Sequence, residues 1–389
     1  MILAVSSSKV VLQLWIIICQ LCLHAAPAMP SDLKLPDIRI FRSCKIGRIY
    51  QFGASFSDTG NDVVQDPMLA SSRLPYGEST FLGPTGRYSD GLLVIDYIAL
   101  AAGIPLLNPY LKNDVDFTHG VNFAVGGATA LSAKALAEKD IMLDGTDNSL
   151  GVQVEWMSNH FASQCNTNIN CSPGSLHDSL FVVGEIGRND YHIAYRQGKT
   201  FRDVQNMVPE VTEIIEKAVR RVIGFGASQV IIPGIFPMGC LPVILTDFKS
   251  NDTSAYDEYG CLIEFNDVIT FHNDYLQNKI IMLQQENPLA TIVYSDYFNG
   301  FKWLLSNADQ LGFDATAALE GCCGNDGPSL NDSSTDGCGS LNVAVCSNPD
   351  RYINWDGVHF TQKAHSVLAS WVVAGLIPEL SCAVGAIYY

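Results

Sequence analysis

Short apolar runs alternate with long amphipathic segments along this chain, and that alternation restricts its fold more than any other feature. In 201–223, apolar side chains such as Val208 and Val211 recur every three or four residues, which predicts an amphipathic helix. The next segment, 229–235, stays apolar after Gln229, which predicts a strand buried on both faces. Buried strands that alternate with amphipathic helices form a parallel sheet with helices on both sides. The sequence therefore predicts an α/β fold.

The same criteria place further elements along the chain. We expect strands at 49–52, 180–186, 229–235 and 290–295, and helices at 92–102, 152–161, 201–223, 259–285 and 361–376. The sequence shows no internal repeat, long linker or low-complexity tract. Because 48% of its 389 residues are hydrophobic, the chain can bury a large core. We therefore expect a single domain after any targeting segment.

The N-terminus has the features of a secretory signal. A mostly apolar run at 10–23 follows Lys9 and precedes the small-x-small pattern Ala26-Pro27-Ala28. The alternative is a signal anchor, but the run is short for a membrane span, and no later stretch approaches the length of one. We expect a signal peptide at 1–28, a mature domain at 29–389 without a membrane span, and secretion or routing through the secretory pathway.

Cysteine usage agrees with an oxidising compartment. Of the twelve cysteines, Cys19 and Cys22 lie in the expected signal peptide, so ten remain, an even number that suggests disulfides. Cys165 and Cys171 are close enough in sequence to close a small loop. Four more lie in a Gly-, Asn-, Asp- and Ser-rich segment that we interpret as a stapled loop: Cys322, Cys323, Cys338 and Cys346. A zinc site is the weaker interpretation, because no Cys-x-x-Cys pair accompanies the vicinal cysteines.

Charge and surface motifs limit the partners. The net charge is −17, and loss of Lys9 with the signal would make it −18 (−17 − 1), which argues against nucleic acid or an anionic membrane and is compatible with a cationic substrate. Sequons at Asn170, Asn251 and Asn331 predict glycosylation. No phosphate loop, dinucleotide fingerprint or HExxH motif occurs, so we expect no cofactor and no metal. We expect a monomer that acts on a small molecule.

Ser55 is the candidate nucleophile. It lies in IYQFGASFSDTGN at 49–61, just past the expected strand end at Gly53, where α/β folds place their ligands. The Gly-x-Ser-x-Gly elbow of lipases is not present, because its fifth position is Ser57. The alternative is a turn without chemistry.

His359 is the candidate general base, and Asp356 is the acid that would orient it. A turn can bring side chains three residues apart into contact, and an acid fixes the histidine tautomer and stabilises the imidazolium. A histidine within reach of Ser55 can take the serine proton and return it to the leaving group. The alternative for this pair is an ordinary surface turn.

Five further blocks, together with FGASFSDTGN, resemble the GDSL (SGNH) esterase/lipase family in its plant secreted branch. They occur in the family's order and spacing: GRYSDG at 86–91, NFAVGGAT at 122–129, IGRNDY at 186–191, FPMGCLP at 236–242 and WDGVHFT at 355–361. The resemblance covers nearly the whole mature chain. It implies a three-layer α/β/α sandwich with a central, mainly parallel, flavodoxin-like sheet, and a carboxylic ester hydrolase.

The resemblance also assigns roles to residues. It implies a catalytic triad of Ser55, Asp356 and His359, and an oxyanion hole made by the backbone N–H groups of Ser55 and Gly127 and the side-chain amide of Asn189. Gly127 has no Cβ, so a substrate oxygen could approach its N–H closely. The alternatives are a plain turn at Gly127 and an Asx turn or helix cap at Asn189 and Asp190, and we interpret Asp190 as that cap.

One position departs from the family pattern. The residue before the nucleophile is Ala54 where the family has Asp. An aspartate there could pin the turn that presents Ser55, so its loss motivates the alternative of a catalytically silent binding protein. The intact Ser55, Asp356 and His359 argue against that alternative.

The text FSDTGN with PYGESTF at 75–81 is most similar to the group within this family that includes acetylajmalan esterase and sinapine esterase. That group acts on small specialised-metabolite esters, often alkaloid or choline conjugates. The expected function is a serine esterase of the apoplast or vacuole that hydrolyses an acetyl or other small acyl ester of a plant specialised metabolite. An acyltransferase that uses the same acyl-enzyme is an alternative that the motifs do not separate.

Overall fold

The structure is a computed structural model that describes residues 37–143, 145–165, 176–324, 337–341, 343–380 and 382. The chain divides into two compact units, Met1–Lys34 and Leu35–Tyr389, and the described residues all belong to the second. The expected signal peptide, the sequons at Asn170 and Asn331, and Cys171 lie outside the described residues. The third sequon residue, Asn251, is described and exposed.

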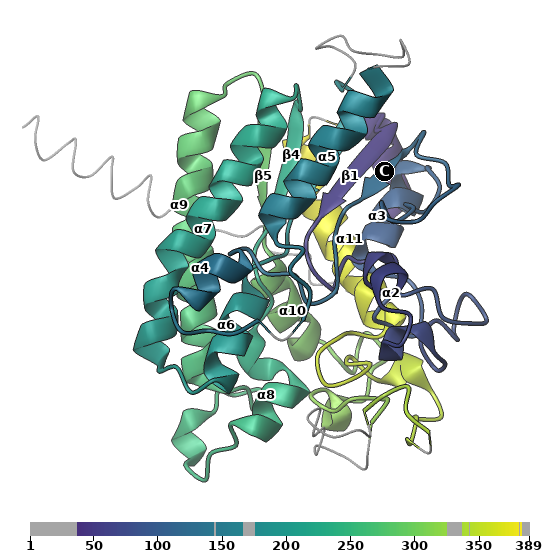
Figure 1. Cartoon of the computed structure of the whole chain (residues 1–389). Coiled ribbons are helices and arrows are strands. Elements are labelled where there is room, and N and C mark those ends of the chain that lie inside the picture. Colours follow the sequence, from purple (N-terminus) through teal and green to yellow (C-terminus); the bar gives the residue numbers. More distant parts are fainter. Residues whose placement is uncertain are drawn as a thin grey trace, which may run out of the picture. The chain divides into compact units, whose positions relative to one another are not determined.

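A five-stranded sheet lies at the centre of the second unit (Figure 1). Its strands are β1 (Arg48–Phe52), β2 (Gly120–Asn122), β3 (Ser179–Val183), β4 (Gln229–Pro233) and β5 (Thr291–Ser295). Every pair is parallel, in the order β2-β1-β3-β4-β5. In this register Ile49 is paired with Leu180 on one side and with Gly120 on the other. The predicted parallel sheet is confirmed, and its strand order is that of flavodoxin-like folds.

Helices cover both faces of the sheet (Figure 1). Helices α5 (Leu150–Cys165), α7 (Phe201–Gly224) and α9 (Ile263–Glu286) pack side by side on one face. Helices α3 (Val94–Ala102), α10 (Tyr297–Ser306) and α11 (Gln362–Glu379) pack together on the other. The shorter helices are α2 (Asn61–Gln65), α4 (Ala133–Ala137), α6 (Arg188–Arg196) and α8 (Pro242–Asp247), with 3-10 turns at η1 (Ile38–Cys44), η2 (Ala70–Ser72), η3 (Met238–Cys240), η4 (Thr253–Ala255), η5 (Ala315–Ala317) and η6 (Pro349–Arg351). The three-layer architecture implied by the family resemblance is confirmed.

The apolar patterns miss some elements and misplace some boundaries. They do not predict β2, which has only three residues, or α6 and α10. The strand expected at 180–186 ends at Val183, because Gly184 follows with a φ of 123° and breaks the extended run. Helix α9 begins at Ile263, later than the expected start at 259. The preceding segment is held elsewhere, by the Cys240–Cys261 disulfide and by the N–H of Leu262, which donates to the C=O of Gly239 in η3 at 2.9 Å.

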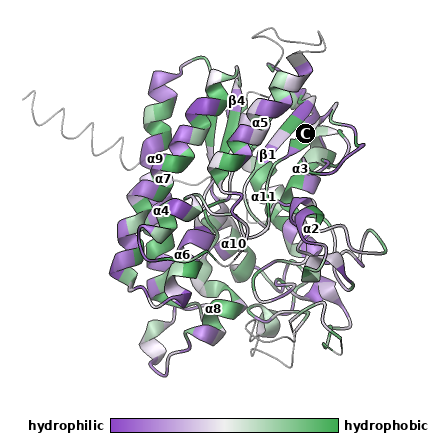
Figure 2. Ribbon diagram, in the orientation of Figure 1, coloured by the Kyte–Doolittle hydropathy of each residue, from purple (hydrophilic) through white to green (hydrophobic). Residues whose placement is uncertain are grey.

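The interior contains the apolar residues that the patterns place there. Phe52 on β1 stacks on Phe123 with ring centroids 5.1 Å apart, and Tyr50 stacks on Phe181 at 4.8 Å. Figure 2 shows hydrophobic residues interrupted by hydrophilic ones around α7 and α9, as expected for helices with one face on the sheet and one in water. Among the described residues, no helix combines the length and hydrophobicity needed to cross a bilayer.

Disulfides join distant parts of the chain. Those among the described residues are Cys44–Cys382, Cys240–Cys261, Cys322–Cys346 and Cys323–Cys338. The last two confirm the stapled loop predicted at these four cysteines. Because all four sulfur atoms are paired, the alternative of a zinc site there is wrong.

Candidate active site

Three predicted site residues lie at the carboxyl edge of the sheet, on segments that follow three adjacent strands. Ser55 follows β1, Gly127 follows β2, and Asn189 follows β3 in the first turn of α6. Parallel strands end at one edge, so the segments that follow them converge there. The order of the sheet also reverses between β1 and β3, which is where open α/β sheets bind ligands. The topology therefore gathers stretches that are far apart in sequence.

Hydrogen bonds connect these segments. The N–H of Gly126 donates to Oδ2 of Asp58, in the Ser55 loop, at 2.8 Å. Nδ2 of Asn189 donates to the C=O of Ala128 at 2.8 Å. The Gly126–Gly127 turn is thus fixed on one side to the Ser55 loop and on the other to α6.

Ser55, His359 and Asp356 form a continuous chain of polar contacts. Nε2 of His359 lies 2.8 Å from Oγ of Ser55, and Nδ1 lies 2.9 and 3.0 Å from the two carboxylate oxygens of Asp356. With Nδ1 protonated and donating to the carboxylate, Nε2 is free to accept the serine O–H. The three residues are buried, with exposures of 4%, 8% and 8%. This geometry is what general-base activation of a serine requires.

Asp356 is held by several donors in addition to His359. Its Oδ1 accepts the N–H groups of Val358 and His359 at 2.8 and 2.7 Å, and its Oδ2 accepts the O–H of Tyr76 at 2.8 Å. Burial alone would raise the pKa of Asp356. The charge of His359 and the hydrogen bonds from its ring and from the backbone outweigh burial and lower that pKa to about 2. The carboxylate is therefore ionised throughout the neutral range.

Asp58 holds the loop that carries Ser55. Its carboxylate accepts backbone N–H groups at 2.7 to 3.0 Å from Gly60, Asn61, Asp62 and Gly126. Burial raises the pKa of Asp58 to about 6, although the bonds from Gly60 and Gly126 act to lower it. These bonds tie down the loop, whereas the hydroxyl of Thr59 has no hydrogen-bond partner among the described residues.

The three donors assigned to the oxyanion hole are available. The N–H groups of Ser55 and Gly127 donate to no described residue. Gly127 is exposed with a φ of 74°, and among the described residues a Cβ there would meet only the side chain of Thr146, at 3.7 Å. The amide of Asn189 uses one of its two N–H groups on Ala128, which orients the second, and that second N–H donates to no described residue.

Two neighbouring polar residues have structural partners. Asp190 is not the helix cap that the sequence suggests, because α6 is capped at Gly187 and the Asp190 carboxylate accepts the N–H groups of Ala130 and Leu131 at 2.8 and 2.9 Å. Arg87 forms a buried ion pair with two 2.8 Å bonds to Asp96, as expected for a structural residue. Within the described ranges, no group of three or more His, Cys, Asp or Glu side chains could hold a metal ion.

The sequence matches a known family over most of its length. The model of the GDSL-like lipase/acylhydrolase family matches residues 49–372. The chain belongs to this GDSL family. It is 42% identical over 350 residues to acetylajmalan esterase 1 of Rauvolfia serpentina, which covers 89% of this chain and 90% of that protein. Sinapine esterase of Brassica napus is 37% identical over 347 residues, with 87% of each chain covered. The family and these esterases identify the chain as a carboxylic ester hydrolase.

Sequence reasoning missed two residues that support this GDSL site. Gln153 on α5 is fully buried, and its amide pairs with both the N–H and the C=O of Gly53, each at 2.9 Å, just where β1 ends. The sequence does offer a signal for Gln153, because it is a polar residue on the buried face of a predicted helix. Tyr76 gives no such signal, because Asp356, the partner of its hydroxyl, lies 280 residues away in sequence.

Ala54, where the chain departs from the family pattern, is buried in the hydrophobic core at 3% exposure. Its C=O accepts the N–H groups of Ser57 and Asp58 at 3.0 and 3.1 Å, so the turn is closed through the backbone. The N–H of Phe56, however, donates to no described residue. An aspartate at position 54 could accept that N–H two residues on, as in an Asx turn.

We therefore expect Ala54→Asp to raise kcat/KM for p-nitrophenyl acetate, by roughly tenfold at most, because a firmer turn holds Oγ closer to its reactive position. Ala54→Asn is the matched variant, with the same acceptor and no charge. The measurement is kcat/KM of both variants beside the wild type. A fall in both would show that the loop is built around alanine, and a fall with Asp alone would show that the added charge is harmful.

Proposed function

We propose that this enzyme is a secreted serine esterase that hydrolyses an acetyl or other small acyl ester of a plant specialised metabolite through an acyl-enzyme on Ser55. The observation that carries the proposal is the 2.8 Å contact between Oγ of Ser55 and Nε2 of His359, with Asp356 on the other ring nitrogen. A free serine hydroxyl is a weak nucleophile, and an adjacent oriented base is what activates it. The same contact weighs against a silent binding protein.

Acylation begins when Nε2 of His359 takes the Ser55 proton as Oγ attacks the carbonyl carbon of the ester. The carbonyl oxygen becomes an oxyanion and accepts hydrogen bonds from the N–H groups of Ser55 and Gly127 and from the amide of Asn189. His359 returns the proton to the leaving oxygen, which departs as an alcohol and leaves the acyl group on Ser55. Throughout this step Asp356 holds Nδ1 and stabilises the imidazolium.

Deacylation repeats the sequence with water as the nucleophile. His359 takes a proton from the water as it attacks the acyl carbon, and the same donors hold the second oxyanion. When the intermediate collapses, His359 gives the proton back to Oγ of Ser55, and the carboxylic acid is released. Replacing the water by an alcohol would give acyl transfer, so product analysis separates the two reactions.

The substrate class is proposed from the relatives and from charge. Acetylajmalan esterase 1 and sinapine esterase are similar to this chain along most of its length, which supports a small ester of a specialised metabolite. The mature charge of −18 (−17 − 1, without Lys9) is compatible with a cationic substrate. Disulfides among the described residues and an exposed Asn251 sequon support a signal peptide at 1–28 and a glycosylated domain at 29–389 in the apoplast or vacuole.

A series of p-nitrophenyl esters tests this proposal. We expect kcat/KM to be highest for acetate or butyrate and to fall by roughly tenfold or more at palmitate. A site that fits a small acyl group binds the transition state of a long-chain ester less tightly. A serine-directed organophosphate should abolish all of this hydrolysis. Acetylated alkaloids and hydroxycinnamoyl cholines are then assayed as substrates, guided by the preferred acyl group, and the products are identified by their mass. A preference for palmitate would contradict the small-ester proposal, and activity that survives the organophosphate would contradict the serine mechanism.

A further inference from the structure

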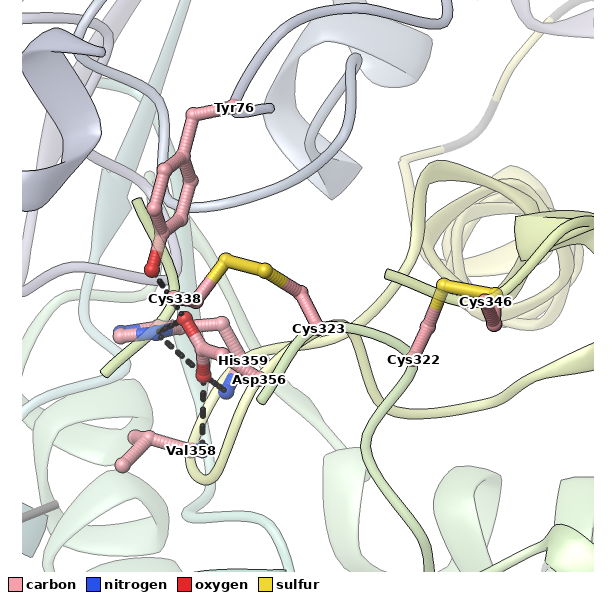
Figure 3. The surroundings of a disulfide bond; sticks show 8 residues. All are labelled: Tyr76, Cys322, Cys323, Cys338, Cys346, Asp356, Val358 and His359. Carbon is pink, nitrogen blue, oxygen red and sulfur yellow. Dashed lines mark hydrogen bonds and ion pairs between the residues drawn. A yellow bond between two sulfur atoms is a disulfide. The ribbon is translucent and has the colours of Figure 1, made fainter. Parts of the chain in front are cut away.

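Tyr76 reaches the candidate triad from a loop that carries none of the predicted site residues. Its O–H donates to Oδ2 of Asp356 at 2.8 Å, and its side chain is 4% exposed. Figure 3 shows the ring pointing its hydroxyl at the carboxylate, which also contacts His359 and the N–H of Val358. Oδ1 already accepts two backbone N–H groups, whereas Oδ2 has only Tyr76 and the His359 ring among the bonds described. The tyrosine hydroxyl therefore restrains one of the two carboxylate oxygens.

The ring of Tyr76 is itself held in place. It belongs to a small buried cluster, separate from the main core, that is made of Tyr76, Cys322, Cys323, Cys338 and Trp355. The cysteines of this cluster belong to the Cys322–Cys346 and Cys323–Cys338 disulfides, both of which are drawn in Figure 3. This cluster, named here the cystine cluster, keeps the Tyr76 ring from leaving its position.

The cystine cluster also supports the turn that carries Asp356. The N–H of Cys323 donates to the C=O of Trp355, the residue just before Asp356, at 2.6 Å. The Trp355 ring meets the Tyr76 ring edge to face at 6.0 Å. One cluster thus places both the Tyr76 hydroxyl and the carboxylate that receives it.

We propose that Tyr76 is a positioning residue, which acts through Asp356 by fixing the rotation of its carboxylate toward Nδ1 of His359 and by sharing its negative charge. The proposal rests on the triad role given to these residues in the proposed function. A carboxylate that loses a donor becomes more basic and binds the imidazolium more strongly. The neutral histidine that the reaction needs would then appear only at higher pH. Tyr76 thereby influences both the geometry and the working pH of the base.

Other charged or titratable groups surround the pair and must be accounted for. They are Glu185, between β3 and α6, and Arg188, the first residue of α6, which interact with the charges of His359 and Asp356 respectively. The others are His365 on α11 and Tyr88, whose ring lies 4.7 Å from that of His359 and whose O–H donates to Asp62. Burial raises the pKa of Glu185, lowers that of Arg188 and lowers that of His365 to about 3. All of these groups remain in a Tyr76→Phe protein, so a changed pH profile reports the missing hydroxyl.

Tyr76→Phe tests the proposal because it removes only the hydroxyl and keeps the ring in the cystine cluster. We expect kcat for p-nitrophenyl acetate to fall roughly tenfold, the size of one hydrogen bond to a charged group, with KM unchanged. We expect the acidic limb of the kcat/KM profile to move up by about half a pH unit, because the imidazolium is held more tightly. Tyr256→Phe is the matched control, since it removes a hydroxyl that bonds to the backbone of Ser250 instead.

The outcomes separate this inference from the proposed function. A wild-type protein without esterase activity or organophosphate labelling would overturn the triad itself. If the wild type is active and the Tyr76→Phe variant has the same kcat and the same pH profile, the role of Tyr76 alone would be overturned. A fall in kcat with the acidic limb unmoved, or a fall that Tyr256→Phe shares, would reduce Tyr76 to a packing residue and also overturn the proposal.

Discussion

Replacing Ser55 by alanine is expected to lower kcat for p-nitrophenyl acetate by roughly 10⁴-fold or more, because the nucleophile is lost and the remaining groups give only weak catalysis. The fold should persist. Among the described residues, the side chain of Ser55 hydrogen-bonds with Nε2 of His359 alone, and Asp356 still holds the ring from its other side. The cost in unfolding free energy is then about 1 kcal/mol, that of one hydrogen bond. Steady-state kinetics and thermal unfolding check the two parts.

Ser57→Ala is the matched control for that experiment. Ser57 lies two residues further along the same buried turn, and its hydrogen bonds with the described residues use its backbone only. We expect it to keep near wild-type kcat and to be labelled by the organophosphate at Ser55. His359→Ala should lose about as much activity as Ser55→Ala, and the double variant little more, since triad members act as a unit. Wild-type activity in Ser55→Ala, or losses that multiply in the double variant, would contradict the acyl-enzyme.

The fold could be predicted from sequence because its signals are local. Each central strand is one short apolar run, and each long covering helix repeats its apolar residues at three and four. Strand β2 could not be found this way, because a three-residue strand has no period, and its pairing with β1 depends on a partner about 70 residues away. The start of α9 was misplaced for a related reason, since the restraint is a disulfide to Cys240 and not a local sequence preference.

In the candidate site too, contacts between residues close in sequence could be predicted, and contacts between distant segments could not. Asp356 and His359 are three residues apart, so their contact could be predicted from one turn. The position just past a strand end indicated Ser55, and the family resemblance added Gly127 and Asn189. These three residues share no local pattern and lie together because their strands are neighbours in the sheet. The resemblance includes Tyr76 within PYGESTF but assigns it no role, and its contact with Asp356 joins two segments that lie 280 residues apart in sequence.

Removing the side-chain amide by Asn189→Ala is expected to lower kcat by roughly 10²- to 10³-fold with little change in KM, the typical cost of one oxyanion donor. The structure gives a specific reason. One N–H of the amide is bonded to the C=O of Ala128 at 2.8 Å, so the second N–H is aimed without freedom to rotate. A preorganised donor of this kind acts most strongly on the charge that develops in the transition state, which is why kcat and not KM should respond.

Alanine at 189 also leaves the buried C=O of Ala128 without its donor, at a cost of about 1 to 3 kcal/mol, so loss of stability must be separated from loss of catalysis. Asn273→Ala provides the comparison, because Asn273 is likewise buried and bonds to both backbone groups of Ile235, at 2.8 and 3.1 Å. It should lose stability and keep kcat within a few-fold. If Asn189→Ala changed KM alone, the amide would belong to ground-state binding. If both variants lost kcat equally, the effect would be one of folding, and the oxyanion would depend on the N–H groups of Ser55 and Gly127 alone.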